Sequence, residues 1–455
     1  MDMFRVLFVY ISLPIFLCVA LAALVSGCAA PRHSKVSSVR ILGGSSADYA
    51  TDVAISSSGA YAIVGNSRSA DYDFVSLNKG YDDIIIIGLD SKGHVKWKTN
   101  LGGRLADFGT NIAATPDGGW VVVGYTRSID GDFMRPSRKS ADVIAAKIDA
   151  NGRPVWKKAF GGSGDDIALA VSVDQEGSIL VTGNTSSKNG DFENTKGDTS
   201  NFFAMKLSST GDKVWTKVYG GTSIEEAYSA ASAGSGEWLI AGYSSSADGD
   251  FDQPHSWGRD AFVMTLDSTG AKKSIKMIGG GSDDVAAAIV ATSDGGYIVA
   301  GSAQSEDVAG YDPRSRNLNN IFVSRYDARG VLLWERNFEG ATVSSLSLAP
   351  NGDIFFTGID KFYRSEPRRM VLVMDDFFVR KIDSSGGNIW RVSYGGTDTD
   401  FATSIVVAPD GGCLLVGHTA SDDGLFDRSA FGGQDVFVLK VDVNGKITPP
   451  PSSYK

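Results

Sequence analysis

Seven copies of one sequence unit fill most of this chain, and their period limits the folds available to it. The unit is marked by a Gly-Gly pair, or by what remains of one. The second residue of the pair stands at Gly44, Gly103, Gly162, Gly221, Gly280, Gly340 and Gly396. The successive intervals are 59 residues four times, then 60 and 56. Self-similarity at a fixed period is typical of repeat architectures, so we expect seven equivalent supersecondary units.

Each unit predicts four short strands separated by turn signals. In the second unit we expect strands at 110–114, 120–125, 142–148 and 155–160. Composition agrees, since 54 of the 455 residues are Gly and each Gly inside a helix costs about 1 kcal/mol relative to Ala. Four antiparallel strands repeated radially form a propeller. The sequence therefore predicts an all-β fold, a seven-bladed β-propeller with four antiparallel strands per blade.

The two ends of the repeat region predict how the ring closes. The last unit supplies three strands, ending near 436–443, and the prolines at 449–451 cannot donate to a strand ladder. The segment 37–42 has the position before the first glycine pair that the fourth strand has in the other units. We therefore expect this N-terminal strand to close the last blade and cover both open edges. The predicted propeller spans 37–446, and a C-terminal tail spans 447–455.

The N-terminus predicts export and a lipid anchor. Residues 6–25 form a nearly continuous apolar run, and the Ser26-Gly27-Cys28 that follows resembles a bacterial lipobox. This predicts a lipoprotein signal peptide at 1–27, palmitate on Cys28 and a tether at 28–36. The alternative is an uncleaved membrane anchor with an incidental cysteine, because such a run is long enough to span a bilayer. Either reading places the domain in the periplasm or outside, on the cell membrane or outer membrane. Resemblance to Gram-negative lipoproteins favours the outer membrane, because Ala29 follows the cysteine.

The whole unit resembles known repeats. The pattern GG-S-x-D-D, D-G-G-Y-I-V-A-G, D-G-D-F and a fourth-strand Trp resembles a repeat of about sixty residues that is widespread in bacterial surface and secreted proteins. The resemblance covers 37–446. The segment 266–270 and the fourth-strand Trp are also similar to quinoprotein-like propeller repeats. One propeller of that kind is a lipoprotein of the outer-membrane β-barrel assembly machinery, and this resemblance implies a scaffold role in outer-membrane assembly as an alternative function.

Two sets of acids recur in the loops of one face. The first set follows the glycine pair and comprises Asp48, Asp107, Asp166, Glu225, Asp284 and Asp400. These acids precede the innermost strands, so they are expected to ring the channel mouth and attract cations. The alternative is that each caps its own turn by bonding backbone N–H groups. The second set lies in the D-G-D-F loops, where Asp248, Asp250 and Asp252 alternate as oxygen ligands do in calcium sites. Calcium is thus the one cofactor that the sequence suggests.

Departures from the repeat are the better candidates for ligand binding. Three consecutive units carry aromatic and basic residues in the loop between the second and third strands. These residues are His255 and Trp257, Tyr311 and Arg314, and Tyr363, Arg364, Arg368 and Arg369. Arginine forks suit carboxylates and phosphates, so the last two groups predict a basic, aromatic sector on an acidic face. Free variation of surface loops is the alternative.

The net charge of the chain and the residue types it contains exclude several classes of function. The net charge of −10 argues against nucleic-acid binding. The sequence shows neither a nucleophile constellation nor a phosphate-binding loop, and the propeller repeats contain only Cys413. The sequence predicts a monomeric, non-enzymatic binding or scaffold module for a protein or glycan partner, held to a membrane by its N-terminal lipid. The rival hypothesis is a hydrolase or lyase that acts on an envelope or extracellular polymer with carboxylates of the same face.

Overall fold

The computed structural model describes residues 39–75, 77–134, 140–193, 195, 199–234, 236–252, 258–305, 320–366, 369–426 and 432–448. Side chains are described in these ranges outside 360–375. All of these residues belong to the second of two compact units, 37–455. Their helical content is two short 3-10 turns, η1 (Tyr72–Phe74) and η2 (Gly131–Phe133). None of the helices described is long and apolar enough to cross a bilayer, and the apolar run at 6–25 lies outside the described residues.

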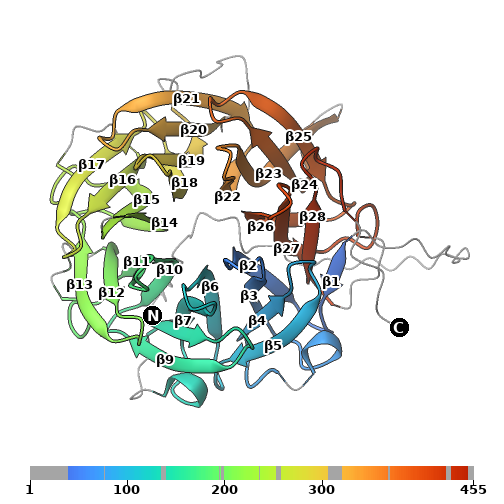
Figure 1. The fold of residues 1–455 in the computed structure, drawn as a ribbon, viewed down its shortest axis with the longest axis horizontal. Coiled ribbons are helices and arrows are strands. Elements are labelled where there is room, and N and C mark those ends of the chain that lie inside the picture. Colours follow the sequence, from blue (N-terminus) through green and yellow to red (C-terminus); the bar gives the residue numbers. More distant parts are fainter. Residues whose placement is uncertain are drawn as a thin grey trace, which may run out of the picture. The chain divides into compact units, whose positions relative to one another are not determined.

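Seven four-stranded antiparallel sheets surround one axis, which confirms the predicted fold class (Figure 1). The first three blades, each from its innermost strand outwards, are β2 (Asp48–Ile55), β3 (Tyr61–Ser67), β4 (Asp83–Leu89), β5 (Val95–Leu101); β6 (Asp107–Ala114), β7 (Trp120–Thr126), β8 (Asp142–Ile148), β9 (Pro154–Phe160); β10 (Asp166–Val173), β11 (Ile179–Thr185), β12 (Asn201–Leu207), β13 (Lys213–Tyr219). The next three are β14 (Glu225–Gly234), β15 (Glu237–Ser244), β16 (Asp260–Leu266), β17 (Lys272–Ile278); β18 (Asp284–Ala291), β19 (Tyr297–Ala303), β20 (Asn320–Tyr326), β21 (Leu332–Glu339); β22 (Thr342–Leu348), β23 (Ile354–Glu366), β24 (Arg369–Ile382), β25 (Asn388–Tyr394).

The last blade joins the two ends of the ring. It contains β26 (Asp400–Val407), β27 (Cys413–Thr419), β28 (Asp435–Val441) and, as its fourth strand, β1 (Arg40–Leu42). The strand β1 pairs antiparallel with β28, with Ile41 opposite Phe437. The predicted closure by the N-terminal strand is therefore confirmed, and β26 also packs against β2 of the first blade.

The hydrophobic core lies between the blades. Among the described residues there are seven apolar clusters, and each combines side chains from two neighbouring blades. The second and third strands are largely buried, and β3 and β4 are buried along their whole length, because each of their faces meets a neighbouring blade. Full burial of one large apolar side chain contributes about 1.5–3 kcal/mol. This shared core explains why a single unit would not be stable alone.

The fourth-strand tryptophans join each blade to the next one. The indole N–H of Trp156 donates to the carbonyl oxygen of Ser209 (3.1 Å), which lies in the next blade's turn between strands three and four. Trp97, Trp215, Trp334 and Trp390 make the same contact with Ala150, Ser268, Ser384 and Val443. Gly211 of the same turn has φ +80° and lies against the Trp156 ring, where a side chain would collide. These tryptophans therefore pack between neighbouring blades.

Blade six differs from the expectation. We predicted that Tyr363 and Arg364 lie in a loop, but β23 and β24 continue as a hairpin in which Phe362 lies opposite Val373 and Glu366 opposite Arg369. The β-branched and aromatic residues of this segment favour strands, and the register extends beyond the length of strands two and three in the other blades. The part of the predicted sector that is described is thus an extension of the sheet and not a loop.

Candidate functional site

The glycine pair between blades is held by carboxylates from two loops. Between blades one and two, the amide of Gly102 donates to Asp132 Oδ2 (3.0 Å), and the amide of Gly103 donates to Asp107 Oδ2 (2.7 Å). The same two contacts recur at Gly43 and Gly44 with Asp73 and Asp48, at Gly161 and Gly162 with Asp191 and Asp166, and at Gly220 and Gly221 with Asp250 and Glu225. The two acid sets seen in the sequence therefore serve one loop structure, in which amide groups converge on anionic oxygens.

The six acids predicted to ring the channel mouth are buried. Asp48, Asp107, Asp166, Glu225, Asp284 and Asp400 are each 0% exposed. Each accepts a hydrogen bond from the amide of the glycine four residues before it. Each also accepts a hydrogen bond from at least one hydroxyl group, as Asp107 does from Ser128 Oγ (2.7 Å). Burial raises the pKa of Asp48, Asp166 and Asp400 to about 6. An exposed ring of carboxylates is thus not formed, because these side chains turn into their own loops, as the alternative expectation states.

The calcium candidates are engaged in the same loop. Asp248 Oδ1 accepts the amide of Thr222 (2.8 Å), and Asp250 Oδ2 accepts that of Gly220 (3.0 Å). Asp252 is exposed. In the part of the chain that the structure describes, there is no group of three or more His, Cys, Asp or Glu side chains placed to hold a metal ion. The first two carboxylates therefore order the turn, and calcium remains a prediction.

The predicted basic, aromatic sector is described only in part. Tyr363, Arg364 and Arg369 lie in the paired region of the β23–β24 hairpin. The remaining candidates lie outside the described residues, and these are His255, Trp257, Tyr311, Arg314 and Arg368. The lipidation candidate Cys28 lies outside them as well. Whether the sector forms one binding surface stays a prediction.

A second set of side chains lies around the axis, one on each innermost strand. We call the following seven residues the collar: Tyr49, Phe108, Ile167, Glu226, Val285, Thr342 and Phe401. Each follows the buried acid directly, or its counterpart Ala341 in blade six. All except Glu226 are half-buried, so solvent reaches them, whereas the second and third strands are largely closed to it. The seven strands that carry them surround the axis in Figure 1.

Aromatic contacts fix three collar residues in place. Phe108 stacks on Tyr125 of the neighbouring strand, with ring centroids 5.0 Å apart. Tyr49 meets His418 edge-on at 5.1 Å, and Phe401 meets the same imidazole at 5.2 Å. Such pairs contribute about 0.5–1.5 kcal/mol beyond their buried area. His418 is 4% exposed, and burial lowers its pKa to about 4. The imidazole is therefore neutral near pH 7 and acts as a packing group.

Three arginines lie at the same end of the blades, where second strands end and third strands begin. They face aspartates in the pairs Arg68–Asp82 (2.6 Å), Arg127–Asp165 (3.8 Å) and Arg259–Asp283 (3.9 Å). Arg68 bonds its partner through two nitrogens, Nε at 2.6 Å and Nη2 at 2.9 Å. The side chain of each arginine is a third or more exposed, so a partner can reach it. Cationic groups thus stand beside aromatic ones on this face.

Blade four gives the collar its one acid. Glu226 is 2% exposed, accepts hydrogen bonds from the hydroxyls of Tyr228 and Tyr243, and has a pKa raised by burial. The guanidinium of Arg259 lies over the Tyr243 ring, 5.1 Å from its centroid. Our sequence analysis missed this cluster. The signal was present, because the position after the repeated acid carries a charge only in blade four.

One further acid links three blades at the axis. Asp52 on β2 accepts Ser404 Oγ (2.6 Å) of the last blade, and Asn111 Nδ2 (2.7 Å) and the Ile112 amide (3.0 Å) of the second. Burial raises its pKa to about 6. These bonds hold the first blade against both of its neighbours, so the role of Asp52 is structural.

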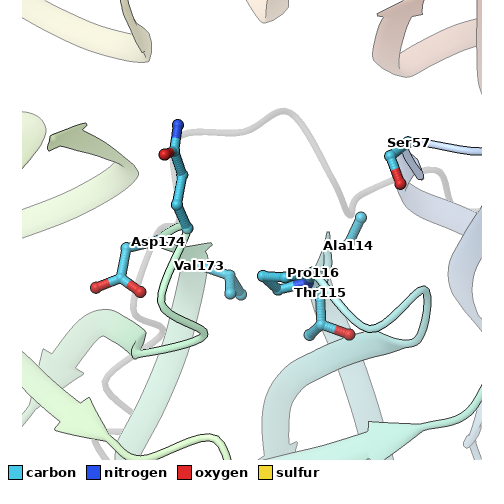
Figure 2. A pocket seen from close by; sticks show the side chains of 7 residues that line it. Ser57, Ala114, Thr115, Pro116, Val173 and Asp174 are labelled. Carbon is cyan, nitrogen blue, oxygen red and sulfur yellow. The ribbon is translucent and has the colours of Figure 1, made fainter.

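A shallow pocket of about 440 Å³ lies at the opposite end of the innermost strands. It is lined by Ser57, Ala114–Pro116 and Val173–Gln175, in the turns that follow β2, β6 and β10 (Figure 2). Asp174 accepts the amide of Ser178 (2.6 Å) and so belongs to its own turn. The lining offers no second ionisable group, and the collar end is therefore the better candidate for recognition.

Comparison with known proteins gives the following similarities. No protein-family model matches the chain. It is 23% identical over 232 residues to the regulatory protein FlaEY of Caulobacter vibrioides, a match that covers 48% of this chain and 24% of that protein. The matched region is thus about a quarter of the length of that curated relative.

Solved structures with a similar fold include propellers of several kinds. They are the Dos1 propeller (TM-score 0.45, 10% identity, 90% of this chain and 97% of that one), a puromycin hydrolase mutant (0.48, 12%, 90% and 54%) and the WD40 domain of Neurospora crassa Pan2 (0.41, 10%, 76% and 90%). These likenesses are too low to transfer a function.

Proposed function

We propose that this protein is a binding module that holds a protein partner at the collar end of its propeller. The observation that carries the proposal is the composition of that end. Aromatic collar residues stand beside three partly exposed arginines, while the repeated acids are withdrawn into the loops. Tyr and Arg are the residue types enriched at the centres of protein interfaces. A rigid ring with side chains from several blades can present them in fixed positions.

The second part of the proposal concerns location. The lipobox at Cys28 supports an envelope lipoprotein, with the propeller held near a membrane by its N-terminal lipid. The described fold begins at residue 39, in the closing blade, so a tether of about ten residues would reach at most about 35 Å. A partner of the collar would then be an envelope or surface protein.

A pull-down from envelope extracts tests the binding proposal. The bait proteins are the wild type, a collar variant (Tyr49→Ala with Phe108→Ala), and the hairpin variant Arg364→Ala, Arg368→Ala, Arg369→Ala. The matched control removes two apolar side chains from the outer rim, Val155→Ala with Val214→Ala, each of which is 58% exposed. Circular dichroism and thermal melting first establish that every bait is folded.

The proposal expects a protein that binds the wild type and the rim control but not the collar variant. Equal recovery with all four baits would overturn it. Loss with the hairpin variant alone would move the interface to blade six and confirm the sector predicted from the sequence. If the bait retains a glycan in place of a protein, the proposed location of the site would stand but the proposed class of partner would be wrong.

A further inference from the structure

Two acidic side chains meet at most boundaries between blades. The acid at the start of each innermost strand lies beside the first residue of the third strand of the preceding blade. The main chain fixes this arrangement, since the amide of Asp107 donates to the carbonyl oxygen of Asp82 (2.7 Å), directly before Asp83. Five boundaries have two aspartates at these positions: Asp435 with Asp48, Asp83 with Asp107, Asp142 with Asp166, Asp260 with Asp284, and Asp376 with Asp400.

The carboxyl groups converge over the first glycine of the pair. A methyl group on Gly102 would lie 2.0 Å from Asp83 Oδ1 and 3.1 Å from Asp107 Oδ2. At Gly395 the corresponding distances, to Asp376 and Asp400, are 2.1 and 3.2 Å. Only a glycine leaves room for both oxygens. Two ionised carboxylates this close and this deeply buried would repel each other strongly.

One oxygen of the Asp83 pair is left without a partner. Asp83 is 1% exposed, its Oδ2 accepts the amide of Lys79, and its Oδ1 has no hydrogen-bond partner. Asp107 Oδ2, by contrast, accepts the Gly103 amide and Ser128 Oγ. A buried ionised oxygen without a donor is costly, whereas a protonated carboxyl can itself donate a hydrogen bond.

The boundary between blades three and four shows what the position requires. There the third strand begins with Asn201, and its Nδ2 donates to Glu225 Oε2 (3.2 Å). A methyl group on Gly220 would lie 2.4 Å from that nitrogen and 2.7 Å from that oxygen, so the amide nitrogen stands where Asp83 has its Oδ1. At this boundary the third-strand residue is a hydrogen-bond donor to the neighbouring carboxylate.

We propose that the two aspartates at each of the other five boundaries share one proton in the folded ring, so that one carboxyl group of each pair donates a hydrogen bond to the other. In the pair Asp83–Asp107 the proton lies on Asp83 Oδ1. Each boundary is then joined by a carboxyl–carboxylate hydrogen bond, which becomes a like-charge repulsion once the proton is lost. The ring is therefore tightest in mildly acidic solution and loosens as the pH rises.

The surroundings of the pair agree with this sign. Burial, together with the charge of Asp107, raises the pKa of Asp83 to about 6, although the backbone amide and the charge of Lys79 act to lower it. The ammonium of Lys79 is paired with Asp132 (2.6 Å), which Lys157 of β9 also contacts (2.6 Å). The other charged groups near this loop form two ion pairs, Arg68–Asp82 and Arg104–Asp130. A folded pKa above the unfolded 3.8 gives stability that is present below pH 3.8 and lost as the pH rises through about 6.

Reciprocal substitutions in the full chain test the proposal. The fourfold variant Asp83→Asn, Asp142→Asn, Asp260→Asn, Asp435→Asn copies the natural Asn201, and Asn201→Asp reverses it. We expect the fourfold variant to melt on the order of 2–4 °C above the wild type at pH 8 and close to it at pH 5. Asn201→Asp should melt lower at pH 8 and unchanged at pH 5. Infrared spectra at pH 5 should show a protonated carboxyl band in the wild type that is weaker in the fourfold variant.

Three results would overturn the proposal. The first is a fourfold variant that is destabilised equally at both pH values while remaining folded, because the aspartates would then be needed as charges. The second is an infrared band that does not differ between the two proteins. The third is a wild-type melting temperature at pH 8 that falls with excess EDTA and recovers with Ca²⁺, since a cation would then join the carboxylates in place of a proton. Asp52, whose pKa is also raised, is present in all the variants, so differences between them exclude its contribution.

Discussion

The short strand that closes the ring is held by a small net free energy of docking. We expect the substitution Leu42→Ala to release this strand. Three side chains of this segment are buried, Val39 at 3%, Ile41 at 6% and Leu42 at 5% exposure. Ile41 packs into the core between the last two blades and Leu42 into the core between the last and the first. Burial of each contributes about 1.5–3 kcal/mol, while ordering each of the four residues 39–42 costs about 1–2 kcal/mol. The net docking energy is thus only a few kcal/mol.

Removing Leu42 beyond Cβ costs about 2–5 kcal/mol, which is comparable with the whole docking energy. We expect the strand to undock and the edge of β28 to exchange its amide hydrogens faster. The matched control is Leu101→Ala, which removes the same groups from the buried end of another fourth strand, β5, which has seven residues and a hairpin to its neighbour. Hydrogen exchange read by mass spectrometry distinguishes the two. Wild-type exchange of β28 in Leu42→Ala, or equally faster exchange of β28 in Leu101→Ala, would refute the reasoning.

Three other predictions concern single side chains. Trp156→Phe loses the bond to the Ser209 carbonyl and should lower the free energy of unfolding in urea by about 1 kcal/mol, while an unchanged midpoint would contradict the role of the indole N–H. Burial lowers the pKa of His418 from 6.5 to about 4, so the unfolded chain takes up a proton first and stability falls as the pH drops from 6.5 towards 4. The variant His418→Tyr, which copies Tyr125, should reduce the dependence of the melting temperature on pH over that range. An unchanged dependence would argue against this role of His418. Cys28→Ser should abolish incorporation of labelled palmitate in cells, and retained label would exclude the predicted lipidation site.

The fold was accessible from the sequence because its signals are local and repeated. Turn glycines such as Gly118, with φ +82°, and alternating apolar strands act within a few residues, and seven copies average out local errors. The predicted third strand of the second unit, 142–148, has the observed bounds of β8. The blade-six hairpin was not predicted, because a diverged repeat no longer shows which of its residues belong to strands and which to loops. Whether such a segment is a strand depends on its pairing with a second segment.

The candidate site was accessible only in part. The repeated acids were found in the sequence. The sequence does not show, however, whether the carboxylate of a loop Asp faces solvent or accepts hydrogen bonds from its own backbone. Asp107 could be assigned only once Gly103, Thr126 and Ser128 were seen around it. The collar acid Glu226 was not predicted, because it directly follows the repeated acid Glu225 and departs from the repeat in one blade alone.

The sequence by itself determined the number of blades and the closure by the N-terminal strand, because periodicity and turn chemistry are properties of the chain. Only the tertiary structure decided what the carboxylates do. Their pairing at the blade boundaries joins residues of neighbouring sheets, such as Asp83 with Asp107, and Asp435 with Asp48 where the last blade meets the first. The protonation state of a carboxyl group depends on the charges and the solvent around it, and those are set by which blades meet.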